Sequence, residues 1–307
     1  MPSPEAAIVF KKNQDLLAAW LADPEATIDD FRVIFEDFLG ELEIPADATF
    51  EDVDAGGVPS IAVTAPGAST DQVVVHFHSG GYVLGSAKGY RSFGAYLSAA
   101  TGARVLLVDY RLAPENPYPA AIDDALAAYD HVVAEGVSPS NIVISGDSAG
   151  GGLALVTLQA LRDRGGEQPA AGVSISPWAD FTLSGESMTT NAANDPIVPG
   201  PDLLAMMAGM IIGEDGDPRN PRVSPIFGDW TGLPPLLVFA GSIETLRDDG
   251  KRAVEAAKQA GVDATFIEGE GMVHIWPTYA ELMPEAVEAR EQIGAFVKSK
   301  VGAGATA

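Results

Sequence analysis

The amino-acid sequence predicts an α/β fold with a mostly parallel central sheet and helices on both of its faces. Short, largely apolar runs recur along the chain, at residues 73–77, 105–108, 142–144, 173–175, 236–239 and 265–267. Helical spacing of apolar residues, as in residues 122–133, occurs between these runs. Strands that are apolar throughout are typical of a parallel sheet that is covered on both faces. The length of 307 residues fits one such domain with a small appendage.

The N-terminal region predicts helices, because it lacks the alternation of a strand. Its apolar residues recur at helical spacing, namely at Ile8, Leu16, Leu17, Trp20 and Leu21. Residues 27–30 match a capping box, a side-chain pattern that begins a helix, and a second apolar face follows at residues 31–38. We therefore predict a helical cap over residues 1–45, followed by an extended segment that includes residues 58–63.

One segment interrupts the alternation of strands and helices. Residues 182–225 contain no strand-like run, but they are rich in proline and include a methionine-rich helical stretch at residues 203–212. We interpret this segment as an insertion at the strand ends that packs with the N-terminal helices. We predict a helical cap at residues 1–45 and a catalytic domain in two parts, at residues 46–181 and 226–307. The cap insertion at residues 182–225 separates these two parts.

Composition excludes several classes of function. The chain has 0 cysteines, so disulfides, thiolate catalysis and cysteine-bound zinc are excluded. Its 18 basic and 43 acidic residues give a net charge of −25, which repels nucleic acid and anionic lipid, so we expect neither as a partner. The apolar runs are too short to span a bilayer, and residues 1–14 lack the pattern of a secretion signal. We therefore expect a cytoplasmic protein.

Residues 146–150 read Gly-Asp-Ser-Ala-Gly, which matches the pattern G-x-S-x-G. The pattern follows the predicted strand at residues 141–145 and precedes a helix that is rich in small residues. A serine on a sharp strand-to-helix turn needs small neighbours, because the backbone is strained and passes close to itself. An ordinary glycine turn is the alternative interpretation. The context favours Ser148 as a nucleophile.

A serine nucleophile needs a general base, and the chain has four histidines. His131 lies on the polar flank of a predicted helix. His76 and His78 alternate on one strand, but no third ligand is apparent nearby, so we predict no metal site. His274 lies in the loop after the strand at residues 265–267, at the sheet edge where α/β sites form. We therefore predict that His274 is the base, although a loop histidine bonded to the backbone is the alternative.

The base needs an acid that holds its tautomer and stabilises the imidazolium. Glu244 lies just past the strand at residues 236–240 and is the predicted acid. Asp248 and Asp249 lie further on, in what we interpret as the first turn of a helix, where negative charge favours the dipole. Asp195 lies in the proline-rich insertion, where ordering of the cap is its expected role.

An acyl-transfer site also needs donors for the oxyanion and a pocket for the substrate. Gly80 and Gly81 follow the strand at residues 73–77, and glycines let backbone N–H groups approach a ligand closely. The N–H of Ala149, the residue after the nucleophile, would complete the oxyanion hole. We predict that the substrate pocket includes Tyr82, Met207 and Met210, although the methionines could instead pack the cap onto the body.

Several motifs in the same order resemble the bacterial hormone-sensitive-lipase-like esterases. They are found at residues 78–82, 109–115, 146–150, 195–196 and 244–248, within a resemblance that runs from about residue 73 to 274. The resemblance implies the α/β-hydrolase fold, an N-terminal helical cap, and oxyanion donors at Gly80 and Gly81. The order Ser148, Glu244, His274 also matches that fold. The chain departs from the family at Ser79, where a glycine is usual, and at Glu244, where aspartate is commoner.

The motifs and the resemblance together imply a serine carboxylesterase that hydrolyses short- to medium-chain acyl esters through an acyl-enzyme on Ser148. No cofactor or metal is expected, and the expected partner is a small ester molecule. An amidase or a lipase with the same machinery is an alternative. A non-catalytic ligand receptor is another, but the similar gibberellin receptors of plants lack the catalytic histidine, which is present here as His274. A homodimer is one expected assembly, since dimers are frequent among similar esterases.

The net charge of −25 leaves two interpretations, a well-solvated acidic surface or an adaptation to salt. Salt screens the repulsion between like charges on a protein surface. We therefore expect the melting temperature and the activity to hold or rise as NaCl increases to the molar range. Melting curves at low and high NaCl measure this, and a steady fall of the melting temperature with salt would contradict it.

Overall fold

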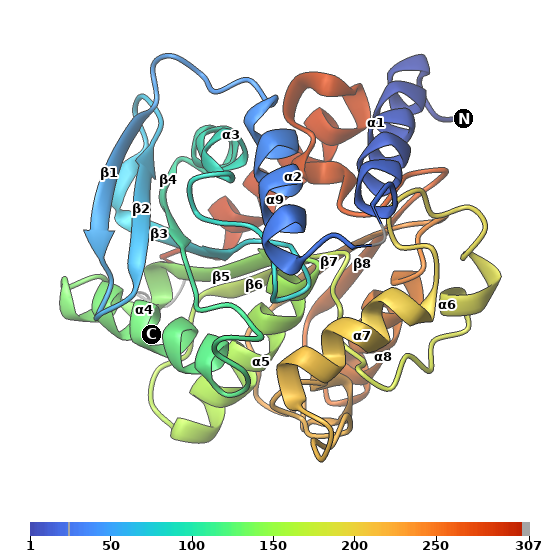
Figure 1. Ribbon diagram of the computed structural model, residues 1–307. Helices are drawn as coiled ribbons and strands as arrows, with labels where there is room; N and C mark the ends of the chain where they lie inside the picture. Colours follow the sequence, from blue (N-terminus) through green and yellow to red (C-terminus); the bar gives the residue numbers. More distant parts are fainter. Residues whose placement is uncertain (24, 303–307) are drawn as a thin grey trace.

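The computed structural model describes residues 1–23 and 25–302. Its centre is an eight-stranded sheet with the strand order β1-β2-β4-β3-β5-β6-β7-β8 (Figure 1). Only the pairings β1–β2 and β2–β4 are antiparallel, which confirms the mostly parallel sheet that the sequence predicts. The strands are β1 (Thr49–Asp54), β2 (Pro59–Thr64), β3 (Ser69–Phe77), β4 (Ala103–Val108), β5 (Ile142–Asp147), β6 (Ala171–Ile175), β7 (Leu236–Gly241) and β8 (Ala264–Gly269).

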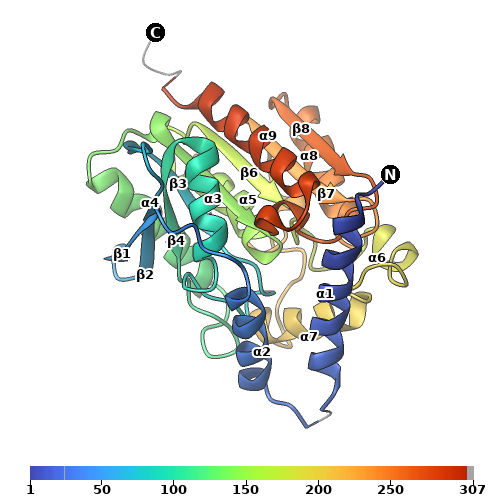
Figure 2. The ribbon, with the colours of Figure 1, turned by 90° about the horizontal axis from the view of Figure 1, so that it is seen from above.

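Helices cover both faces of the sheet. α3 and α9 pack together on one face, whereas α4, α5 and α8 lie on the other (Figures 1 and 2). The strands between these layers are buried, and β5, β6 and β7 are buried at every position. The helices are α1 (Pro4–Leu21), α2 (Ile28–Gly40), α3 (Arg91–Thr101), α4 (Ala120–Ala134), α5 (Ala149–Arg164), α6 (Ser187–Thr190), α7 (Pro201–Ile212), α8 (Arg247–Gln259) and α9 (Pro284–Lys300).

Three helices lie beyond the edge of the sheet at which the parallel strands end. Figure 2 shows α1, α2 and α7 side by side at this edge, apart from the helices that flank the sheet. The predicted capping box at the start of α2 is confirmed, because Thr27 and Asp30 each accept from the other's backbone N–H. The division of the chain into cap and body at residues 45, 181 and 225 stays a prediction.

Side chains far apart in the sequence tie these helices to the body. Arg32 on α2 donates to the carboxylate of Glu115 at 2.7 Å and to the backbone oxygen of Val83 at 3.0 Å. Ser3, at the start of α1, donates its N–H to Glu285 on α9 at 2.6 Å. The positions of α1 and α2 over the strand ends are therefore fixed by specific polar contacts as well as by apolar packing. Along the described stretches of chain, every helix is too short or too polar to traverse a lipid bilayer.

Candidate active site

Ser148 occupies the sharp turn between β5 and α5. Its backbone has φ 55° and ψ −119°, a conformation that costs a non-glycine residue roughly 1–3 kcal/mol. The turn depends on the glycines on either side of the serine. A Cβ atom on Gly146 would lie 2.1 Å from the backbone oxygen of Gly150, and one on Gly150 would lie 2.0 Å from that of Phe77. No larger residue fits at either position, so the sequence pattern here is dictated by space.

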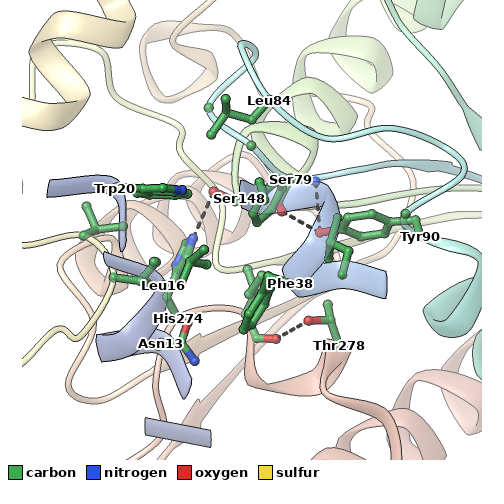
Figure 3. A pocket seen from close by; sticks show the side chains of 18 of the residues that line it. Asn13, Leu16, Trp20, Phe38, Ser79, Leu84, Tyr90, Ser148, His274 and Thr278 are labelled. Carbon is green, nitrogen blue, oxygen red and sulfur yellow. Dashed lines mark hydrogen bonds between the residues drawn. The ribbon is translucent and has the colours of Figure 1, made fainter. Parts of the chain in front are cut away.

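The loop after β8 brings His274 to this serine. Nε2 of His274 lies 2.9 Å from Oγ of Ser148, which is hydrogen-bonding distance (Figure 3). Both residues are buried, and both line one cavity. The structure therefore brings together the two residues that the sequence selects as nucleophile and base.

Glu244, in the loop after β7, lies on the far side of the imidazole. Its Oε1 is 3.6 Å from Nδ1 of His274, slightly beyond hydrogen-bonding distance. Its Oε2 accepts from the Gly241 N–H at 2.9 Å and from the Ser176 hydroxyl at 2.7 Å. The carboxyl group has no solvent exposure, so it is held entirely by protein groups.

Burial and mutual attraction set the protonation of this pair. Burial raises the pKa of Glu244, although the interactions with His274, Gly241 and Ser176 act in the opposite direction. Burial lowers the pKa of His274, but the carboxylates near it, Glu244 first and then Asp195 and Asp147, together outweigh burial, so the pKa of the imidazole is raised above its ordinary value of 6.5. The imidazolium form is therefore stabilised inside the protein.

The alternative carboxylates bind backbone groups elsewhere. Asp248 accepts from the Ser187 N–H at 2.9 Å, and Asp195 accepts from the Thr245 N–H at 2.8 Å. Asp249 lies in the first turn of α8, as predicted, but it is fully buried and accepts two backbone N–H groups of the loop after β6. Burial raises the pKa of Asp249 to about 8. The predicted place of Asp249 in the first turn of α8 is therefore correct, but the residue is a buried group that binds the loop after β6.

The loop after β3 places two glycines beside Ser148 in the cavity lining. Gly80 has φ 116° and Gly81 has φ 62°, values that favour glycine. A Cβ atom on Gly80 would lie 2.2 Å from the backbone oxygen of Leu84. Ala149 is the first residue of α5, so its N–H is one of those that helix geometry leaves without an intrahelical partner.

Ser79, which stands where similar esterases usually have a glycine, has a specific hydrogen-bond partner. The Tyr90 hydroxyl lies 2.5 Å from Oγ of Ser79 and 2.6 Å from Oδ2 of Asp147 (Figure 3 shows the contact with Ser79). A carboxylate only accepts hydrogen bonds, so Tyr90 donates to Asp147 and the Ser79 hydroxyl donates to Tyr90. This chain connects the loop after β3 to the residue that precedes the nucleophile. Tyr90 was not predicted from the sequence, because no motif marks it.

His76, on β3, and His78, which directly follows that strand, contact other protein groups. His76 is fully buried on β3, with Nε2 3.1 Å from Oδ1 of Asp147. His78 stacks on the ring of Tyr110 with the centroids 4.3 Å apart, and its Nδ1 lies 2.7 Å from the backbone oxygen of Ser79. Within residues 1–23 and 25–302, no cluster of histidine, aspartate and glutamate has the form of a metal site.

The cavity around Ser148 and His274 is mainly apolar. Besides the two glycines, its walls come largely from α1, α2 and α7, with the apolar side chains Leu16, Trp20, Phe35, Phe38, Leu39, Leu203, Leu204 and Met207. Figure 3 shows Leu16, Trp20 and Phe38 around the Ser148–His274 pair. The helices beyond the strand ends therefore enclose the reacting pair in an apolar environment.

The structure corrects two of the three predicted pocket residues. Met207 lines the cavity, but Tyr82 and Met210 do not. Tyr82 is buried among aromatic rings of the body, with Trp178 6.3 Å and Phe181 6.0 Å away between centroids. Met210 is half-buried, off the fully buried face of α7 that includes Met207. Sequence spacing along α7 did not distinguish these two faces.

Comparisons with known proteins agree with the fold. The family described as alpha/beta hydrolase fold matches residues 74–278. An acetyl-hydrolase of Streptomyces hygroscopicus is 44% identical over 78% of this chain and 79% of its own length. An esterase of Acinetobacter venetianus is 39% identical over 76% of each chain.

A solved structure is similar over nearly the whole chain. The crystal structure of an esterase from the bacterial hormone-sensitive lipase family superposes with a TM-score of 0.93 and 42% sequence identity. The match covers 98% of this chain and 100% of that esterase. The chain therefore belongs to the α/β-hydrolase family, in its branch of esterases that are similar to hormone-sensitive lipase.

Proposed function

We propose that the protein is a serine carboxylesterase that hydrolyses short- to medium-chain acyl esters through an acyl-enzyme on Ser148. The observation that carries this proposal is the 2.9 Å approach of His274 Nε2 to the Ser148 hydroxyl inside an apolar cavity. A nucleophile and a base within hydrogen-bonding reach of each other can carry out acyl transfer. The named activities of the similar proteins support the same reaction class.

In the proposed reaction, His274 takes the proton of Ser148 as the hydroxyl oxygen attacks the ester carbonyl. Backbone N–H groups of Gly80, Gly81 and Ala149 donate to the oxyanion of the tetrahedral intermediate. His274 then gives the proton to the leaving alcohol. Water hydrolyses the acyl-enzyme by the same route, with His274 again as base.

Glu244 is the proposed acid of this triad. It accepts from Nδ1–H of His274 and stabilises the imidazolium that forms when Ser148 loses its proton. The separation of 3.6 Å suits this role, because catalytic hydrogen bonds are often long in the absence of substrate and shorten as charge develops. The raised pKa of His274 has the same cause, since the carboxylate favours the charged ring.

The nucleophile is tested by Ser148→Ala. We expect the folded variant to lose ester hydrolysis by several orders of magnitude, because only oxyanion and binding effects remain without the serine. Hydrolysis of p-nitrophenyl butyrate measures the loss, and circular dichroism verifies folding. A folded variant that keeps more than about a tenth of the wild-type kcat would exclude Ser148 as the nucleophile.

The acid is tested by Glu244→Gln, which we expect to lower kcat ~10³-fold or more. The pH profile of kcat/KM gives a second readout. In the wild type the rate falls as the pH drops through the pKa of His274, above 6.5. In Glu244→Gln the imidazole stays buried but the carboxylate that raises its pKa is gone. We therefore expect the fall in rate to occur at a lower pH than in the wild type.

Asp248→Asn is the matched control for the acid. Asp248 follows Glu244 closely in the chain but binds the Ser187 N–H, so we expect an effect mainly on stability, about 1 kcal/mol or less. Thermal melts and kcat are measured on both variants. An inactive Asp248→Asn together with an active Glu244→Gln would show that the triad acid is wrongly assigned.

The cavity predicts a preference for short acyl chains, about C2 to C8, because α1, α2 and α7 close it around Ser148. Met207→Ala removes a side chain that lines the cavity next to Gly81, and we expect it to shift the optimum toward longer chains. Met206→Ala is the control, because Met206 is exposed on the same helix. A panel of p-nitrophenyl esters measures the optimum, and faster turnover of C16 than of C4 esters by the wild type would refute the preference.

A further inference from the structure

The end of β6 contacts the backbone of the nucleophile. The Ser148 N–H donates to the backbone oxygen of Ile175 at 2.8 Å, and the Trp178 N–H donates to the backbone oxygen of Ser148 at 2.9 Å. Between these two contacts lies Ser176, a fully buried residue that no sequence motif marked. The N–H of Ser176 donates to the backbone oxygen of Phe239 on β7 at 2.7 Å. The backbone around Ser176 is therefore held by the nucleophile turn on one side and by β7 on the other.

The hydroxyl of Ser176 joins the loops of the acid and the base. It donates to Oε2 of Glu244 at 2.7 Å and accepts from the N–H of Ile275, the residue after His274, at 3.0 Å. A hydrogen bond to a buried carboxylate is stronger than one between neutral groups. One hydroxyl therefore connects two loops that follow different strands.

The backbone is strained where these segments meet. Ser148, Ser176 and Ile275 have φ values of 55°, 46° and 52°, in the left-handed region that non-glycine residues seldom adopt. Such conformations persist only where the surrounding contacts hold them, and they occur often at active sites. The bond between Ile275 and the Ser176 hydroxyl is one of these contacts.

We propose that Ser176 is a positioning residue that holds the Glu244 carboxylate and the His274 loop in register for proton transfer. This inference rests on the proposed function. With Oε2 bound by Ser176 and Gly241, the other oxygen of Glu244 faces Nδ1 of His274. Ser176 does not line the cavity, so it acts through Glu244 and His274 and not on the substrate.

The first test is Ser176→Ala. We expect kcat to fall about 10- to 100-fold, the loss typical of a hydrogen bond to a charged group, with KM unchanged within about twofold. Ser174→Ala is the matched control. Ser174 is a buried serine on β6 itself, and its hydroxyl donates to the backbone oxygen of Gly151 at 3.0 Å, away from Glu244. We expect Ser174→Ala to keep the wild-type kcat.

A double-mutant cycle separates positioning from general support of the fold. If Ser176 acts through the Glu244 carboxylate, Ser176→Ala lowers kcat by a smaller factor in a Glu244→Gln background than in the wild type. A residue that only supports the fold would lower kcat by the same factor in both backgrounds. Equal losses in the two backgrounds would therefore overturn the proposal, as would a Ser176→Ala variant with wild-type kcat.

Two further measurements keep the test decisive. Should Ser176→Ala fail to fold, Ser176→Gly replaces it, because glycine suits the positive φ and also lacks the hydroxyl. The same loss of kcat is expected.

The low-field proton NMR signal of His274 Nδ1–H can be measured without substrate. We expect it to shift in the Ser176 variants and to stay in Ser174→Ala, and an unchanged signal would overturn the proposal. Absence of ester hydrolysis by the wild type would count against the proposed function alone.

Discussion

The arrangement of the site depends on one steric constraint, the contact between the start of α5 and the end of β3. At Gly150 the space that a Cβ atom would need is occupied by the backbone oxygen of Phe77. The turn that carries Ser148 therefore lies directly against the strand that leads into the glycine loop. Because the two backbones touch, neither can move without the other, and the distance between the nucleophile and Gly80 is set by covalent geometry and packing.

Around this contact, hydrogen bonds buried in the protein connect the remaining segments. Asp147 is bound by His76 and Tyr90 on one side of the turn, and the backbone of Ser148 is bound by the end of β6 on the other. Charged groups in a medium of low polarity interact strongly, and water does not screen them. The acidic surface and the internal pair of Glu244 and His274 are therefore separate electrostatic systems, and salt acts mainly on the surface.

The residues of the site that the sequence predicted lie in local patterns. Gly146 and Gly150 mark the turn because space there permits no side chain, and Glu244 and His274 lie in the loops that follow β7 and β8. Ser176 and Tyr90 escaped prediction because their partners, Glu244 and Asp147, are 68 and 57 positions away in the chain. Tyr82 was misplaced because the rings that bury it, Trp178 and Phe181, are also far away in the chain, and Met210 was misplaced for a different reason. Spacing along a chain indicates which residues share a helix, but the tertiary packing decides which face meets the cavity.

The walls of the cavity and the reacting groups come from different parts of the chain. Trp20, Phe35 and Phe38 precede the first strand, whereas Ser148, Glu244 and His274 follow β5, β7 and β8. Substitutions in the first two helices can therefore alter which molecules fit without touching the groups that react. Gene duplicates of such a protein could therefore diverge in substrate through changes in α1, α2 and α7 while they inherit the reaction unchanged.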